Sequence, residues 1–237
     1  MKSEGTPLQC YLGGIGGMVR GFFFYPKNGN PFTLPLFLSL GENISGYILS
    51  EKMEFGLEDA WRFLNFNLLG YYHASMFNIL TEAKWEKFRY FYPLLSAIEG
   101  YGGSILLRKE NNVTFGDAFA EVEYMRLGIT SPLSFLGGLQ LLSEKSIKKE
   151  IYVLSSFAGS LVGTYFGHQL SKKRNLTFGQ ALLITFTPRI IEGIILGTTI
   201  LLTKNFAEKE WGIALLLVSI SDPIGTFFFD KLFTSGL

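Results

Sequence analysis

The sequence predicts an all-α fold of about eight helices, and three observations lead to this prediction. Eight apolar segments of about 17–28 residues are separated by short polar or charged connectors. These segments are too long for strands, and they lack the regular alternation of apolar and polar residues that strands show. A glycine pattern and a helix-start motif also recur about every 60 residues, and a regular period is typical of arrays of similar helical units.

The helix-start motif is clearest in the second half of the chain, where residues 114–118 read TFGDA and residues 177–181 read TFGQA. A threonine hydroxyl in this position satisfies a free backbone N–H group of the first turn, so both threonines are candidate N-caps. The acid of the first copy falls in the first turn, where the helix dipole favours a negative charge. A diverged copy, EFGLEDA, occupies residues 54–60.

The period sets the predicted layout of the helices. Three glycines, Gly46, Gly103 and Gly167, each begin a Gly-x-x-Leu unit upstream of a helix-start motif. We therefore expect one repeat domain, 1–237, built from three parallel helical hairpins with a half-unit at each end. The predicted hairpins are 31–87, 88–149 and 150–209, and the half-units are 6–30 and 210–237.

Glycines spaced four residues apart indicate close helix packing. In water each glycine disfavours a helix by about 1 kcal/mol relative to alanine. In a membrane, small residues at this spacing allow two helix backbones to approach closely. The predicted packing residues are Gly13, Gly17, Gly21, Gly46, Gly103, Gly163 and Gly167.

The length of the apolar segments matches a bilayer span, which needs about 20 residues. Segment 181–203 contains twelve Leu, Ile or Phe residues, which favour insertion by about 4–7 kcal/mol in total. Its Arg189 and Glu192 oppose insertion by about 5–7 kcal/mol together, so this helix needs help from its neighbours. The alternative is a soluble helical solenoid, but segment 151–171 has no formal charge and little polar face. We therefore predict a membrane-embedded fold.

The composition excludes several classes of function. A net charge of +1 argues against a nucleic-acid partner, because such proteins normally carry a basic stripe. The single cysteine, Cys10, rules out an internal disulfide and a cysteine-rich metal site. His73 and His168 are expected to be hydrogen-bonded core residues. No cofactor is predicted, and no serine or lysine stands in a catalytic motif.

Charged residues inside the apolar segments are the candidate site. Glu42 and Glu99 occupy equivalent repeat positions, as do Arg126 and Arg189. This alignment predicts pairs such as Glu99 with Arg126. Intramembrane charges indicate an ion or proton path, but pairs that follow the repeat also fit a purely structural role, which we favour.

Two further carboxylates lie in predicted spans. Glu192 follows Arg189 by three residues, so the two share a helix face and partly neutralise each other. Asp222 precedes Pro223 and has no counterpart in the other repeats. A broken helix with a carboxylate is one way in which transporters hold a cation; the alternative is a kinked helix whose second half Asp222 caps.

The combined pattern resembles the Gly-rich helical-hairpin repeat proteins of the bacterial envelope. It is best matched by GTYFGHQL at residues 163–170, followed by TFGQA at 177–181. The likeness extends from about residue 34 over most of the chain, and the first copy departs from it by placing Glu54 where the others have threonine. The resemblance implies a membrane of the bacterial envelope, without indicating which one, and it implies no activity.

The expected function is that of a non-enzymatic integral membrane subunit or scaffold. Such a protein packs through its Gly-rich helices against partner proteins or a second copy of itself, surrounded by membrane lipid. The alternative is a small multi-helix transporter or channel with Glu42, Glu99 and Asp222 on its path. Lysines and arginines divide evenly between the two sets of connectors, so the sequence predicts no orientation in the membrane.

Overall fold

The fold was analysed in a computed structural model, which describes residues 6–24, 32–84, 88–107, 113–203 and 208–234. These residues form eight helices and no strand, so the all-α prediction is confirmed. The helices are α1 (Thr6–Phe24), α2 (Thr33–Met53), α3 (Leu57–Thr81), α5 (Phe91–Leu107), α6 (Phe115–Ser143), α7 (Lys149–Ser171), α8 (Phe178–Leu202) and α9 (Glu208–Thr234).

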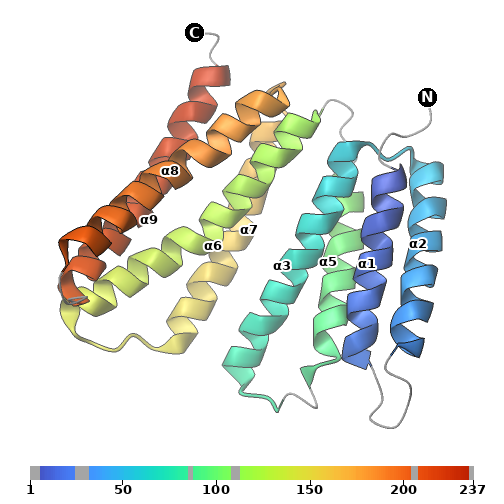
Figure 1. Cartoon of the computed structure of the whole chain (residues 1–237), viewed down its shortest axis with the longest axis horizontal. Helices are drawn as coiled ribbons and strands as arrows, with labels where there is room; N and C mark the ends of the chain where they lie inside the picture. Colours follow the sequence, from blue (N-terminus) through green and yellow to red (C-terminus); the bar gives the residue numbers. More distant parts are fainter. Residues whose placement is uncertain (1–5, 25–31, 85–87, 108–112, 204–207, 235–237) are drawn as a thin grey trace. The chain divides into compact units, whose positions relative to one another are not determined.

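The helices gather into two compact units, Met1–Asn111 and Asn112–Leu237, where the sequence analysis expects one repeat domain (Figure 1). In the first unit α1 packs along α2 and α3 packs along α5, and α1 also touches α3 and α5. In the second unit α6 packs along α7 and α8 packs along α9, and α6 also packs against both α8 and α9. Each unit is therefore a group of four helices built from two hairpins.

These hairpins pair the helices differently from the predicted ones. The predicted hairpin 31–87 joins α2 to α3, whereas in the structure α2 packs along α1. The reason lies in the glycines of the Gly-x-x-Leu units, which face the helix that precedes them. A Cβ added at Gly46 would lie 3.2 Å from the Gln9 carbonyl oxygen, and one at Gly103 would lie 2.6 Å from the Phe66 ring. The 60-residue repeat itself stays a prediction.

Glycines mark the closest approaches between helices in both units. Along the α1–α2 crossing, side chains at Gly13, Gly17 and Gly21 would run into the backbone of α2. Along the α6–α7 crossing, Gly128 and Gly159 face each other so closely that an added Cβ on either would collide with the other's carbonyl. The glycines thus set the spacing of the hairpins.

The helix starts follow the predicted capping chemistry. Thr114 Oγ1 accepts the Asp117 N–H at 3.1 Å, and Thr177 Oγ1 accepts the Gln180 N–H at 3.3 Å, so both threonines are N-caps as predicted. In the diverged copy, Gly56 donates its N–H to Asp59 Oδ2 at 3.1 Å. The shared local chemistry starts α3, α6 and α8.

The cap of α6 also holds the connector between α7 and α8. Asp117 is fully buried, and its Oδ1 accepts the Leu176 N–H at 3.0 Å. Thr114 Oγ1 donates in turn to the Leu176 carbonyl at 2.7 Å. Leu176 belongs to the small apolar core of the second unit, together with Ala120, Ala181 and Ile184. One cap therefore fixes a helix start, a connector and a core residue.

We expect Asp117→Ala to lower the stability of the second unit by about 2 kcal/mol, because the buried Leu176 N–H and the half-buried Thr114 N–H lose their acceptor. The matched control is Gln180→Ala in the corresponding cap of α8, where the Thr177–Gln180 bonds are exposed. That change should cost about 0.5–1 kcal/mol. Thermal unfolding of both variants in detergent measures the difference, and equal losses would contradict the proposed anchoring of the connector.

Candidate functional site

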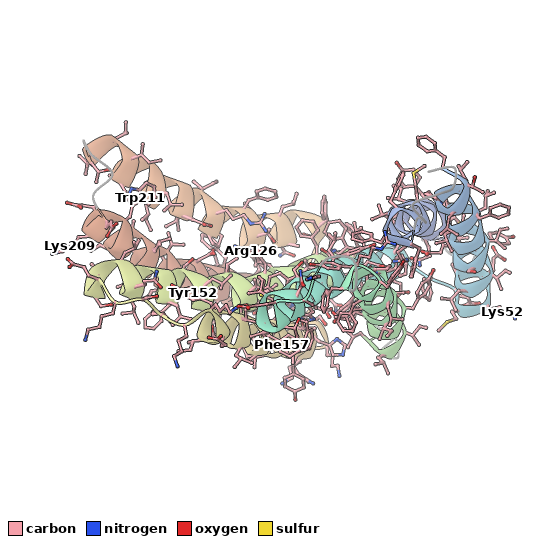
Figure 2. The ribbon with its side chains drawn as sticks, turned by 90° about the horizontal axis from the view of Figure 1, so that it is seen from below. Lys52, Arg126, Tyr152, Phe157, Lys209 and Trp211 are labelled. Atoms are coloured by element: carbon pink, nitrogen blue, oxygen red, sulfur yellow. The ribbon has the colours of Figure 1, made fainter. Side chains whose placement is uncertain are left out.

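Polar and charged side chains lie inside the units together with apolar ones, while many other large apolar side chains point outward. The largest fully buried side chains include Arg62, Gln9, Glu123 and Asp117. Along the outer side of α2, by contrast, a row of apolar residues is exposed: Leu36, Phe37, Leu40, Ile44 and Ile48. Figure 2 shows such side chains projecting from the helices. Charged residues are almost never fully buried unless they are paired. Apolar side chains such as Phe55, Phe63 and Ile184 are fully buried beside these polar groups.

In the first unit, Arg20 is the centre of a polar network to which all four helices contribute. Its guanidinium, 3% exposed, pairs with both carboxylate oxygens of Glu42 on α2. It also donates to Asn67 Oδ1 on α3 at 2.6 Å and to Ser96 Oγ on α5 at 3.2 Å. Ser96 donates in turn to Asn67 Oδ1 at 3.0 Å. Among the described residues, this network meets the hydrogen-bonding needs of a buried cation.

Glu99, the second predicted carboxylate of this unit, lies beside His73. Its Oε1 is 2.7 Å from His73 Nδ1, and the histidine side chain is almost fully buried. The predicted partner was Arg126, which instead contacts Glu123 and Asp222. The prediction failed because the glycine side of α5 packs along α3, so Glu99 meets a residue of α3.

In the second unit, a charged cluster lies at mid-helix level among α6, α8 and α9. Arg126 of α6 donates to Glu123 Oε1 at 2.6 Å and to Asp222 Oδ2 on α9 at 2.7 Å. Arg189 of α8 donates to the other oxygen of Glu123, also at 2.7 Å. Two arginines predicted to be equivalent therefore converge on one carboxylate, that of Glu123, which is 1% exposed.

Glu192 adds a further carboxylate near this cluster. It lies one turn beyond Arg189 on α8 and is electrostatically coupled to Asp222, Arg126 and Glu123. Arg189 acts on Glu192 electrostatically, while its guanidinium donates a hydrogen bond to Glu123. The cluster thus contains three carboxylates and two guanidiniums.

A second polar cluster lies toward the end of the same unit. Asp230 of α9 accepts hydrogen bonds from Arg174 Nη1 and from the Tyr124 hydroxyl, each at 2.5 Å. Arg174 belongs to the α7–α8 connector, is 7% exposed, and has its Nε 3.7 Å from Asp117 Oδ1. This cluster joins the start of α6, the connector and the last turns of α9.

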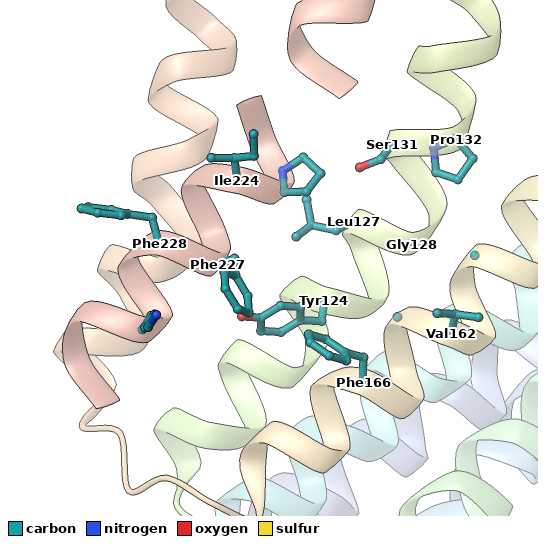
Figure 3. A pocket seen from close by; sticks show the side chains of 14 residues that line it. Tyr124, Leu127, Gly128, Ser131, Pro132, Val162, Phe166, Ile224, Phe227 and Phe228 are labelled. Atoms are coloured by element: carbon teal, nitrogen blue, oxygen red, sulfur yellow. The ribbon is translucent and has the colours of Figure 1, made fainter. Parts of the chain in front are cut away.

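An apolar groove of about 700 Å³ runs between α6, α7 and α9 of the second unit. Figure 3 shows Tyr124, Phe166 and Phe227 at one part of it and Ser131 and Pro132 at another. The exposed Lys231 lies at its margin. Its lining supplies few polar groups, so its chemistry suits an apolar chain better than a polar substrate.

The predicted packing glycines lie at helix crossings, and one of them, Gly13, faces the backbone of Glu42. All seven glycines have a neighbouring helix or its side chains against the position of a Cβ. Of the predicted charges, Asp222 is buried, Arg189 is exposed and the others are partly buried. The sequence analysis missed two of their partners, Arg20 and Glu123, and also the pair Arg174 and Asp230. Glu123 and Arg126 share a helix face by their spacing of three, which is the signal that could have found Glu123.

The chemistry of these clusters is that of ion pairs and hydrogen bonds. The described residues contain no group of three His, Cys, Asp or Glu side chains arranged to hold a metal ion. Two helices, α8 and α9, are long and apolar enough to cross a membrane, judged by length and composition. Comparisons with protein-family models, curated proteins and solved structures found no match for this chain.

Proposed function

We propose that this chain is a non-enzymatic integral membrane subunit of the bacterial envelope that assembles with other membrane helices, from partner proteins or from a second copy. The observation that carries the proposal is that both units bury charged side chains and expose many large apolar ones. Fully buried Arg62 and Glu123 contrast with outward-facing residues such as Phe37 and Leu201, which are 70% and 85% exposed. Lipid is the surrounding in which exposed leucine and phenylalanine are favourable and charged groups face the bundle interior.

The hydropathy of single helices understates this membrane character. Only α8 and α9 among the described helices meet the criteria for a span. The other helices carry more polar residues, and several of these are buried between helices, as with Arg20 of α1 and Asn67 of α3. A helix whose polar residues are satisfied by its neighbours inserts as part of a bundle, so averages over single helices miss it.

Assembly is supported by glycines that no helix covers. A Cβ added at Gly193 or Gly197 of α8 would meet nothing within 4 Å. These two glycines are four residues apart, the same spacing that brings α1 against α2. The same face carries Ile190 and Ile194, each 61% exposed. This surface fits a second membrane helix.

The first test concerns the membrane itself. We expect the expressed protein to stay in the membrane fraction after a carbonate wash and to require detergent for extraction. Release of folded protein by the wash alone would contradict the proposal.

The second test concerns assembly, measured as mass by light scattering in mild detergent. The wild type should form a complex larger than one chain, and the double variant Gly193→Leu/Gly197→Leu should dissociate it. Gly41→Leu on α2 is the matched control, because Gly41 is also uncovered but lies on another helix. A single chain in the wild type, or an intact complex in the α8 variant, would contradict assembly through α8.

A small ion transporter remains the second candidate, and one observation favours it. Glu42 and Glu99 each have a positively charged or titratable partner, Arg20 and His73. Asp222 differs, because its Oδ2 binds Arg126 while its Oδ1 is buried without a hydrogen-bond partner. Of the three carboxylates predicted to lie on an ion path, Asp222 is the one with free capacity.

A further inference from the structure

One face of α9 forms a continuous buried polar surface, which we call the α9 polar face and define as Asp222, Thr226 and Asp230. The three residues are spaced four apart, so they lie above one another on the same side of the helix. Their exposures are 3%, 0% and 4%. The face spans about 12 Å along the helix axis, at 1.5 Å per residue. It leads from the middle of α9 to within one turn of its last described residue, Thr234.

Each residue of this face has an oxygen atom without a partner. Asp222 Oδ1, Thr226 Oγ1 and Asp230 Oδ1 are all buried and lack a hydrogen bond. Thr185 of the adjacent α8 is 3% exposed, and its Oγ1 atom also lacks a hydrogen-bond partner. Pro223 has no N–H group, so the backbone carbonyl of Ser219 lacks its helical donor as well. Buried polar atoms nearly always have partners, so these unpaired oxygens form a candidate site for a ligand. At the Asp230 end the Arg174 Nε and Nη2 atoms are also unpaired, so the candidate site lies at the Asp222 end.

The charges around the α9 polar face point to the sign of that ligand. At the Asp222 end, Glu123, Asp222 and Glu192 face two guanidiniums, those of Arg126 and Arg189.

At the other end, Asp117 and Asp230 face the single guanidinium of Arg174, with Tyr124 as a neutral donor. Lys231 follows Asp230 in the chain but is exposed at the apolar groove. Each end therefore has one more carboxylate than guanidinium. The buried oxygens of Asp222 carry this excess where the side chain is 3% exposed, and a positive ligand there would offset it.

We propose that the α9 polar face binds a monovalent cation at Asp222, either a proton or an alkali-metal ion. Oxygen atoms of carboxylates, hydroxyls and freed backbone carbonyls are the ligands with which membrane proteins hold such ions. A single positive charge balances the excess at the Asp222 end, whereas a divalent ion beside the Arg126 guanidinium would exceed it. The proposal adds a specific binding site to the second candidate function, ion transport. It rests on the proposed membrane location but not on assembly through α8.

The test measures thermal unfolding of the purified protein in detergent. In one series sodium, potassium or lithium replaces choline at fixed ionic strength, and in another the pH is varied without alkali ions. Bound alkali ion should raise the unfolding temperature by about 5–10 °C at one hundred times the dissociation constant. If the ligand is a proton, the folded protein holds a proton that the unfolded chain releases, so the unfolding temperature falls as the pH rises.

Three variants complete the test. Asp222→Asn should abolish the response. This change also leaves Arg126 without one partner, which can unfold the unit. The variant Asp222→Leu/Arg126→Met therefore removes both partners, and it should abolish the response as well. Thr226→Val should weaken alkali-ion binding at least tenfold but leave a proton response unchanged, which separates the two ligands. Glu144→Gln, at an exposed ion pair with Lys209, is the control that keeps the full response.

A wild type that responds to neither alkali ion nor pH overturns the proposal, as does a full response in the folded Asp222 variants. If either result is obtained with a protein that still needs detergent for extraction, only the cation-site proposal is contradicted. If a carbonate wash releases the protein, the proposed membrane function is contradicted instead.

Discussion

Replacing Arg20 with methionine is expected to destabilise the first unit by about 3 kcal/mol. The change keeps the length and apolar part of the side chain but removes the cation that contacts α2, α3 and α5. Breaking a buried pair by removing one partner costs about 3–5 kcal/mol, because the other charge stays uncompensated. The lower end of this range applies to Arg20→Met, because the Glu42 side chain is 18% exposed and its charge is therefore not fully buried.

The double variant Arg20→Met/Glu42→Leu separates this cost from simple loss of packing. It removes both charges, and Ser96 still donates to Asn67 Oδ1. Its stability should therefore recover to within about 1 kcal/mol of the wild type, because replacing a buried ion pair with apolar residues is often neutral. Thermal melts in detergent give the comparison. If the stability loss of the double variant equals the sum of the losses of Arg20→Met and Glu42→Leu, the two residues are not coupled.

The substitution Gly163→Leu is expected to cost about 3 kcal/mol or more. Overpacking a tight contact costs about 1–3 kcal/mol, occasionally more, and here the obstacle is backbone and cannot rotate away. An added Cβ would collide with the Tyr124 carbonyl of α6 and would come within 3.3 Å of the Gly128 Cα. The α6–α7 hairpin must open to accommodate it.

Gly193→Leu on α8 is the matched control for this prediction. It adds the same side chain to a helix of the same unit, at a position with nothing within 4 Å. In monomeric protein it should change the unfolding temperature very little. Similar losses of stability for Gly163→Leu and Gly193→Leu would contradict the prediction. They would show that leucine destabilises the helix that carries it rather than the α6–α7 crossing.

The local features of this fold were predictable because they depend on residues close together in the chain. Thr114 and Thr177 cap helices through bonds to residues three positions away, so sequence alone places them. The packing glycines were predictable for the same reason, because spacing defines a helix face.

The partners of buried charges could not be predicted in this way. Arg20 meets Asn67 and Ser96 across 47 and 76 residues, so the contacts depend on which helices become neighbours. The predicted pairing of Glu99 with Arg126 assumed hairpins displaced by one helix, and one displaced helix changes every partner. Asp230 was missed because it lies near a helix end, where a charge is unremarkable in sequence.

Accessibility of spin labels to oxygen and to a water-soluble nickel chelate tests most directly the claim that the outer faces of these helices contact lipid. Labels are attached to cysteines introduced at Leu40 of α2 and Ile190 of α8, which are 63% and 61% exposed, in a Cys10→Ser background reconstituted into vesicles. Lys173, exposed in the α7–α8 connector, is the reference for water. The account predicts high oxygen and low nickel accessibility at both helix positions, with the reverse at Lys173. High nickel accessibility at Leu40 and Ile190 would place these faces in water and contradict it.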